Sequence, residues 1–220
     1  MHVDHDPARD AFLAELDAFA ATAGTLGERQ LLAASRCLGW TSGNVIVHVH
    51  LGLQEMLLGL VSRTDEEPDS DAARYWQGPA PGEGDWLDGT RFVQLLSASY
   101  HRPSGAVRHL LPTVEGVRAA TAALEPGAVQ FQGQVLSTGD FLATWAVELA
   151  VHHLDLDTDG AAPAPAAGRL ARETVEALVG GAFPAAWPDA TVALLGTGRV
   201  RPTAAQIEAA PLAAELPVLG

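Results

Sequence analysis

Apolar residues recur along this chain mostly with the spacing of an α-helix. The first apolar stripe consists of Phe12, Leu13, Leu16 and Phe19. Asp6 followed by Pro7 is typical of a helix start, and the glycines from Gly24 to Gly27 mark the end of the pattern. The sequence therefore predicts a first amphipathic helix that begins at Asp6.

A second helix is predicted from Thr41 to about Ser62. The Thr41 hydroxyl can cap its first turn. The apolar positions cover a broad arc and comprise Val45, Ile46, Val49, Leu53, Met56, Leu57, Leu60 and Val61. Such a wide apolar face is typical of a helix that packs against neighbours on several sides.

The third helical region, from Thr90 to about Leu124, contains a break. Pro103 interrupts the pattern and Ser104 can cap a restart, so the region is either one broken helix or two consecutive helices. The polar segments Thr64–Asp71 and Pro79–Asp88, which precede it, are predicted to be loops.

The fourth long helix is predicted from about Thr138 to Leu156. Ser137–Asp140 resembles a capping box at its start, and a short extended piece near Val129–Phe131 precedes it. Four long amphipathic helices predict a mainly α protein built as a four-helix bundle.

The chain is expected to continue beyond the bundle into a small appendage. Residues 158–168 have the Ala-, Pro- and Gly-rich composition of a linker, which assigns the bundle to residues 1–157. Residues 169–220 then contain a predicted helix (Leu170–Val179), a predicted strand (Thr191–Leu195) and a short helix. The expected fold is therefore mainly α, with a small α/β C-terminal appendage.

Composition narrows the classes of partner. The chain has 27 acidic and 13 basic residues, all of the latter Arg, and a formal net charge of -14. Phosphate backbones would repel such a chain, so we expect no nucleic-acid partner. No stretch reaches about 18 uninterrupted apolar residues, and the N-terminus lacks the pattern of a signal peptide. With a single cysteine, Cys37, no disulfide within the chain is expected, and we predict a cytoplasmic protein without a membrane partner.

The fourth helix carries the most informative polar pattern. Phe141, Trp145, Glu148 and His152 share one face of it. The two aromatic residues indicate that this face points inward, where a carboxylate and an imidazole are costly unless they are compensated. A metal ion held between facing helices would compensate them. A mutual pair of Glu148 and His152, or an Arg partner, would do so as well, and the spacing alone leaves both readings open.

The second helix offers two further imidazoles, His48 and His50. They lie about 200° apart around the helix axis, so only one of them can point at a given site. His50 falls within the apolar arc, whereas His48 shares its side with Gly52 and Glu55. Periodicity does not choose between the two.

Several other polar side chains could each have one of two roles. Cys37 is either a nucleophile or a small buried apolar residue. Asp155 could orient a ligand or cap the helix, and His153 points about 140° away from Glu148. Arg199, in a tight turn, could bind a substrate carboxylate or lie on the surface. The sequence has no GxSxG elbow, HExxH helix, phosphate loop or CxxC pair, which excludes several common enzyme classes.

Three segments resemble a known family. Residues 37–41 (CLGWT), followed by His48, resemble the C-x-G-W-T…H signature of the mycothiol-dependent maleylpyruvate isomerase family, which belongs to the DinB-like superfamily. Residues 148–155 (ELAVHHLD) resemble its E-L-A-V-H-x-x-D signature. Residues 196–199 and 216–220 are similar to its T-G-R…P-L-x-G ending. The resemblance spans nearly the whole chain and implies a DinB-like four-helix bundle.

The resemblance also implies a metal site. The family's ligands fall on His48, Glu148 and His152, which decides between His48 and His50. Three protein ligands leave an open position on a divalent ion, with Zn²⁺ the expected metal. One departure is Ser42–Asn44, where members often have an apolar residue, a basic residue and Asp.

The implied chemistry is activation of a low-molecular-weight thiol, mycothiol, as cosubstrate. Its addition or transfer to a small electrophile would make the protein an S-transferase or a maleylpyruvate-type cis–trans isomerase, with Arg199 a candidate for substrate recognition. Two alternatives are a non-catalytic protein that binds metal or small molecules in the same pocket, and a structural bundle in which Glu148 and His152 pair.

Overall fold

The structure is a computed structural model that describes residues 1–77, 83–158 and 162–219, without the side chains of residues 83–87. Parts of three predicted segments lie outside the described residues: residues 79–82 of the loop, residues 159–161 of the linker, and Gly220.

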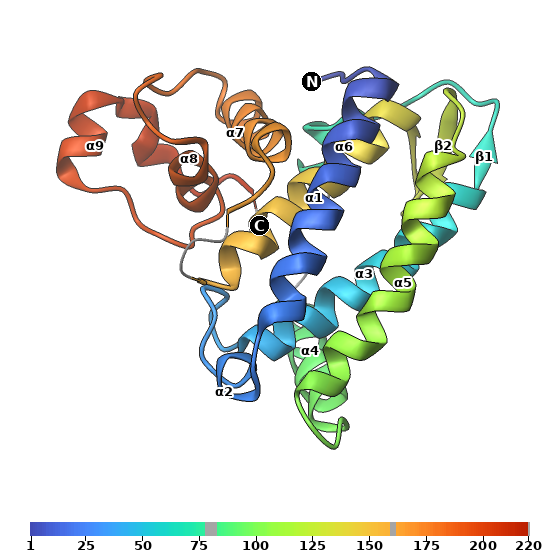
Figure 1. The fold of residues 1–220 in the computed structure, drawn as a ribbon. Helices are drawn as coiled ribbons and strands as arrows, with labels where there is room; N and C mark the ends of the chain where they lie inside the picture. Colours follow the sequence, from blue (N-terminus) through green and yellow to red (C-terminus); the bar gives the residue numbers. More distant parts are fainter. Residues whose placement is uncertain (78–82, 159–161, 220) are drawn as a thin grey trace.

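Four long helices form the core of the molecule (Figure 1). They are α1 (His5–Thr25), α3 (Ser42–Val61), α5 (Ser104–Ala122) and α6 (Thr138–Asp155). Helix α1 packs along α6, and α3 packs along α5, so the bundle consists of two closely packed pairs. The predicted mainly α four-helix bundle is confirmed.

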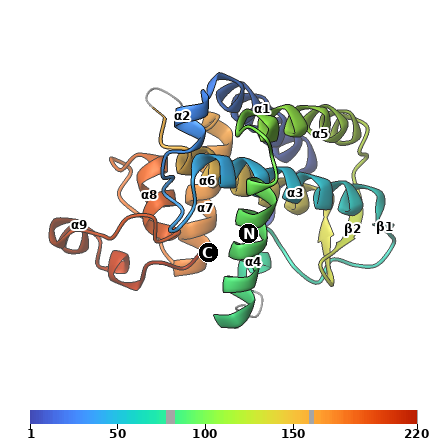
Figure 2. The ribbon, with the colours of Figure 1, turned by 90° about the horizontal axis from the view of Figure 1, so that it is seen from below.

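The break predicted in the third helical region is also observed. Helix α4 (Glu83–Ala98) ends before Pro103, and α5 begins at Ser104. Helix α4 starts within the segment predicted as a loop, and a short helix, α2 (Glu28–Leu31), was not predicted. Figure 2 shows α4 beside α3 and projecting away from the bundle.

The described residues contain one small antiparallel sheet, with the strand order β1-β2-β3. Its strands are β1 (Arg63–Thr64), β2 (Ala128–Phe131) and β3 (Gln134–Ser137). Gln132 and Gly133 form the hairpin turn with φ values of 49° and 77°, as a two-residue turn between twisted strands requires. The extended piece predicted near Val129 is β2, whereas the other two strands were not predicted.

Local capping explains where two bundle helices begin. Thr41 Oγ1 accepts a hydrogen bond from the Asn44 backbone N–H at 3.2 Å, and Ser137 Oγ accepts one from the Asp140 N–H at 3.0 Å. Both starts were predicted. For α1 the prediction was wrong by two residues, because the capping position is Asp4 and not Asp6.

All regular elements among the described residues of the C-terminal region are helices. This region contains α7 (Pro165–Val179), α8 (Asp189–Gly196), α9 (Ala204–Ala209) and the 3₁₀-helix η2 (Pro211–Glu215). The strand predicted at Thr191–Leu195 is wrong, because this segment lies in α8. A short apolar run does not distinguish a strand from a buried helix, and Val192, Ala193 and Leu195 are buried in this helix.

The predicted linker is shorter than expected, because α7 begins at Pro165 and includes residues 165–168. Helix α7 packs against both α6 and α8, so the C-terminal region lies directly on the bundle (Figure 1). The division into a bundle of residues 1–157 and an appendage of residues 169–220 stays a prediction.

Helix α3 is the one described helix long and apolar enough to cross a membrane by length and composition. Core helices of water-soluble proteins pass the same test. Val45, Ile46, Leu53 and Met56 of α3 are fully buried or nearly so, and α3 packs against α5, α4 and α6. Its apolar face therefore belongs to the bundle core.

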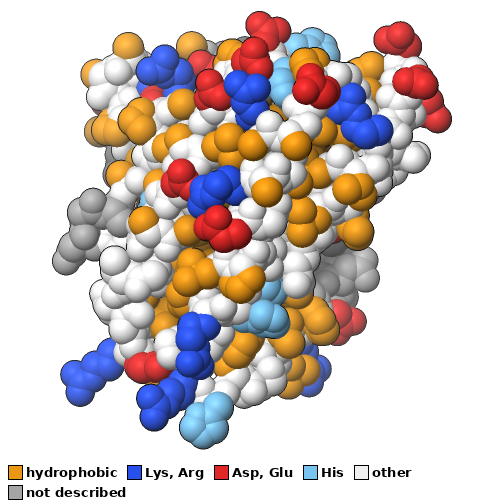
Figure 3. All heavy atoms as spheres, turned by 45° about the vertical axis from the view of Figure 1, so that its right-hand side comes forward, with side chains coloured by type: hydrophobic (Ala, Val, Ile, Leu, Met, Phe, Trp, Pro, Cys, Tyr) orange, Lys and Arg blue, Asp and Glu red, His pale blue; other side chains and the backbone are white. Residues whose placement is uncertain are grey.

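Charged side chains of both signs lie on the face shown in Figure 3. Arg and His side chains gather at its lower end, near the start of α5. The exposed residues His101, Arg102 and Arg108 line a shallow hollow there. This basic patch is separate from the site described next.

Candidate functional site

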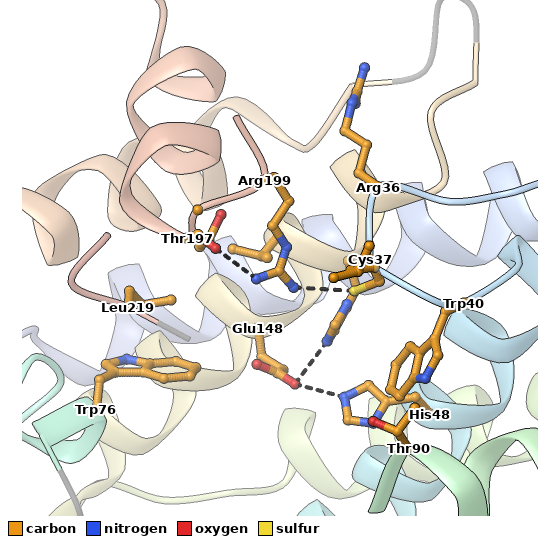
Figure 4. Close-up of a pocket in the computed structure, with 14 residues that line it drawn as sticks. Arg36, Cys37, Trp40, His48, Trp76, Thr90, Glu148, Thr197, Arg199 and Leu219 are labelled. Carbon is orange, nitrogen blue, oxygen red and sulfur yellow. Dashed lines mark hydrogen bonds and ion pairs between the residues drawn. The ribbon is translucent and has the colours of Figure 1, made fainter. Parts of the chain in front are cut away.

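Helices α3 and α6 bring His48, Glu148 and His152 together. Figure 4 shows the Glu148 carboxylate facing the His48 ring. His48 Nε2 lies 3.2 Å from Glu148 Oε1, and His152 Nε2 lies 3.1 Å from the same oxygen. The two imidazole centroids are 4.6 Å apart. One donor atom from each residue lies within 4.8 Å of the other two, so a single metal ion could contact all three.

The inward orientation predicted for the α6 stripe is confirmed. Phe141 and Trp145 are buried on the same face as Glu148 and His152. The two histidines of α3 point to different places, as the helix geometry requires. His50 is only 4% exposed, and its ring centroid lies 4.5 Å from that of His109 on α5, so His50 does not contact the cluster.

Asp155 sets the protonation pattern of His152. His152 Nδ1–H donates to Asp155 Oδ2 at 2.9 Å. In a neutral His152, Nε2 then carries the lone pair, and this lone pair faces the carboxylate oxygen of Glu148. His152 Nε2 and Glu148 Oε1 are then two acceptor atoms only 3.1 Å apart, and this arrangement requires a positive charge between them. A metal ion would satisfy both, so the donor set fits a divalent cation such as Zn²⁺.

The electrostatics of the cluster agree with this reading. Burial opposes the charged form of His152, but the Glu148 carboxylate raises the pKa of His152 well above its ordinary value. Burial likewise opposes ionisation of Glu148, yet the two imidazoles hold its pKa well below the ordinary value. The site therefore favours an ionised carboxylate together with a bound positive charge, which a proton or a metal ion can supply.

Asp155 is itself held by residues from two other segments. Arg199 Nε donates to Oδ1 and Arg199 Nη2 to Oδ2, both at 3.1 Å, and the Cys37 thiol lies 3.1 Å from Oδ2. Burial raises the pKa of Asp155, but the hydrogen bonds and charges of His152 and Arg199 outweigh it and lower this pKa to about 2. Of the two readings for Asp155, the geometry favours orientation of a ligand.

The cluster lies in the wall of a cavity of about 410 Å³. Its lining residues are Arg36, Cys37, Leu38, Trp40, His48, Trp76, Thr90, Glu148, Val151, His152, Thr197, Gly198, Arg199 and Leu219. Arg199, the candidate for substrate recognition, lines this cavity. Sequence reasoning missed Arg36, Trp76 and Thr90, because three separate segments carry them and no shared periodicity links them.

His153 lies outside the cluster, as predicted. It belongs to a second buried group on the other side of α6. His153 Nδ1 lies 2.8 Å from Glu15 Oε1, and its Nε2 lies 2.9 Å from Thr22 Oγ1. The second oxygen of Glu15 accepts from the Ala164 backbone N–H at 2.5 Å. Sequence reasoning missed Glu15, which is a charged residue within an otherwise apolar stripe of α1.

A mainly α bundle with a His–Glu–His cluster facing a cavity defines a DinB-like protein with a candidate metal centre. The sequence model of the mycothiol maleylpyruvate isomerase N-terminal domain matches residues 12–157, and the chain belongs to this family. The matched residues include His48, Glu148 and His152. The resemblance inferred from the sequence motifs is thereby confirmed.

A solved structure supports the fold. The crystal structure of the mycothiol-dependent maleylpyruvate isomerase superposes with a TM-score of 0.61 over 90% of each chain, at 14% sequence identity. At this identity the likeness establishes the DinB-like fold and not a shared reaction. No curated protein matches the chain.

Proposed function

We propose that this protein is a metal-dependent enzyme that activates mycothiol for addition or transfer to a small electrophile. The reaction would be that of an S-transferase or of a maleylpyruvate-type cis–trans isomerase. The observation that carries the proposal is the convergence of His48 Nε2 and His152 Nε2 on one oxygen of Glu148, at the wall of a cavity. Membership of the mycothiol maleylpyruvate isomerase family supports mycothiol as the thiol.

The donor set suits Zn²⁺ in a catalytic role. Two imidazole nitrogens and one carboxylate leave a position open for a further ligand. When bound there, the ion would supply Lewis acidity that stabilises a thiolate at neutral pH. His48, Glu148 and His152 would hold the ion, and no protein nucleophile is then needed.

The remaining residues prepare the site for this chemistry. Asp155 holds His152 Nδ1–H, which keeps Nε2 available as a ligand. Arg199 positions Asp155 through two hydrogen bonds and closes one side of the cavity. The Trp40 ring packs against one side of the cluster, with its centroid 5.1 Å from that of His48. A direct role for Arg199 in binding a substrate carboxylate stays a prediction.

We also propose that the protein is cytoplasmic. Cys37 is a free thiol within this cavity. A free thiol is typical of a reducing compartment, and a low-molecular-weight thiol is a usable cosubstrate only where it stays reduced. Both points support a cytoplasmic enzyme.

The metal content of purified variants tests the ligand assignment. About one equivalent of Zn²⁺ is expected in the parent protein, with loss in His48→Ala and His152→Ala. His50→Ala is the matched control, because it removes an imidazole from the same helix without touching the cluster. Thermal melting of each variant with a chelator present checks that it folds. Full metal retention in His48→Ala would contradict the assignment.

Activity assays then separate the functional alternatives. If the protein is an enzyme, the rate of thiol consumption in the presence of an electrophile should depend on metal and should fall in the His152→Ala variant. Metal and thiol binding without turnover would instead favour the non-catalytic binding protein. Absence of metal from the parent protein, prepared without chelators, would favour a structural pair of Glu148 and His152.

A further inference from the structure

The described cavity wall carries two cationic side chains besides the imidazoles, Arg36 and Arg199. Each nitrogen of the Arg199 guanidinium donates a hydrogen bond within the protein. Its Nε and Nη2 donate to the two oxygens of Asp155, and its Nη1 donates to the Thr197 carbonyl at 3.1 Å. The side-chain carboxyl of Asp155 is completely buried, so the pair is shielded from water. A substrate carboxylate would have to displace Asp155 in order to use this fork, and breaking a buried pair is costly.

The guanidinium of Arg36 is also paired, but at a more exposed position, where the Arg36 and Asp157 side chains are 33% and 57% exposed. Its Nη1 donates to the Leu154 carbonyl at 2.6 Å, and its Nη2 forms an ion pair with Asp157. Each Arg of the wall therefore pairs with an Asp, Arg199 with Asp155 in the last turn of α6 and Arg36 with Asp157 just after this helix. Residues 78–87, 159–161 and 220 include no Arg, Lys or His, so the undescribed parts of the chain add no cation.

The rest of the wall is mainly apolar. Trp40 and Trp76 lie on opposite sides of Glu148 in Figure 4. Val151 and Leu219 add aliphatic surface to this wall. A cavity bounded by two indoles suits a flat apolar molecule, because aromatic rings bind well by stacking or by edge contacts. The net charge of -14 opposes the approach of anions to the protein as a whole.

From the two neutralised guanidiniums and the two indoles, we infer that the electrophile of this site is an uncharged, flat, apolar molecule and not a carboxylate-bearing one. This inference rests on the proposed thiol chemistry and specifies its substrate class. It favours S-transfer over the isomerisation of a dicarboxylate such as maleylpyruvate. An aryl halide is one such electrophile. In its substitution, the thiol sulfur forms a C–S bond with the ring carbon that carries the halogen, the halide leaves with the bonding electron pair, and the thiol proton passes to the buffer.

Two aryl chlorides that differ by one carboxylate test the inference. The neutral probe is 2-chloro-1,3-dinitrobenzene and the anionic probe is 4-chloro-3,5-dinitrobenzoate, each assayed with mycothiol and corrected for its uncatalysed rate. The kcat/KM of the metal-loaded protein should be higher for the neutral probe by about tenfold or more. Equal or faster turnover of the benzoate would overturn the inference.

A single substitution should weaken this preference. Asp157→Asn removes the carboxylate that neutralises Arg36, and Asn tolerates the positive φ of 49° at this position. The advantage of the neutral probe should shrink by about threefold to tenfold, because the freed guanidinium can pair with the benzoate. Asp10→Asn is the matched control. It makes the same change in net charge within an exposed pair on α1, and it should leave the ratio unchanged.

Calorimetric binding separates this inference from the proposed catalysis. The ligands are the two thioether products, mycothiol S-linked to the dinitrophenyl ring or to the dinitrobenzoate ring. Tighter binding of the uncharged ring supports the inference even if neither chloride is turned over, in which case the catalytic proposal alone fails. Equal binding of both conjugates, tighter binding of the benzoate conjugate or binding of neither would overturn the inference.

Discussion

Asp155 connects the proposed metal ligands with the rest of the cavity wall. It accepts hydrogen bonds from His152 and from Arg199 with its two carboxylate oxygens, and it also contacts the Cys37 thiol. These partners come from α6, from the turn after α8 and from the segment before α3. One buried carboxylate therefore orients an imidazole and fixes the position of a guanidinium at the same time.

Replacing Asp155 by Asn should weaken metal binding. The amide cannot hold the Nδ1–H of His152 as a carboxylate does, so Nε2 is less basic and less well oriented. The expected loss of Zn²⁺ affinity is about tenfold to a hundredfold, measured by competition with a chromophoric chelator. Asp157→Asn, two residues further along and without contact to His152, should bind Zn²⁺ like the parent protein. Unchanged affinity in the Asp155 variant would mean that this hydrogen bond does not tune the site.

At the scale of the elements, the cavity depends on how closely α3 approaches α6 and the sheet. Gly59 permits this approach, because a Cβ atom there would lie 2.7 Å from Phe141 and 2.9 Å from Phe131. Both rings are buried and contact each other with centroids 5.2 Å apart, so neither can move aside easily. The same packing places His48 opposite Glu148.

Gly59→Ala should therefore destabilise the protein although alanine is the better helix former. The expected loss in the free energy of unfolding is about 1–3 kcal/mol from overpacking, measured by urea denaturation. Gly116→Ala in α5 is the matched control, because nothing lies within 4 Å of its added Cβ. That variant should gain up to about 1 kcal/mol from helix propensity. Similar stability changes in the two variants would show that the approach of α3 is not tight at Gly59.

At the scale of the whole molecule, Glu15 joins the bundle to the C-terminal region. One of its carboxylate oxygens pairs with His153 of α6, and the other accepts from the Ala164 N–H directly before α7. Burial raises the pKa of Glu15 above its ordinary value, and the hydrogen bonds from His153 and Ala164 offset only part of this effect. The contact that orders the start of α7 therefore depends on pH.

The sign of this dependence follows from proton linkage. Below the ordinary Glu pKa of about 4.3, Glu15 is protonated in both the folded and the unfolded chain. As the pH rises from there through the raised folded-state pKa, the unfolded chain loses its proton first, so the folded state loses stability. Glu15→Gln has no such proton, and its stability relative to the parent protein should therefore increase with pH across this window.

Urea denaturation of the parent and Glu15→Gln proteins between about pH 4 and 7 measures this difference. A strong chelator in both samples removes the contribution of metal binding. Glu115→Gln, which changes an exposed carboxyl of α5, is the control and should follow the parent protein. A constant difference between the parent and Glu15→Gln proteins at all pH values would contradict the expectation.

Much of this fold is predictable because its signals are local. The apolar spacing of each bundle helix, the Thr41 cap and the Ser137 cap all act within one or two helical turns. The wrong and the missing predictions of strands also have physical causes. The five-residue run Thr191–Leu195 is too short for its period to be read, and β1 pairs with β2 across more than sixty residues of chain.

The sequence by itself determined the four helices, the inward stripe of α6 and the placement of His152 one turn after Glu148 on that stripe. These features depend on the 3.6-residue period of a single helix. Only the tertiary structure decided that Arg36 and Arg199 are neutralised by Asp157 and Asp155. Contacts between segments more than forty residues apart depend on how whole helices pack, and no local pattern encodes that packing.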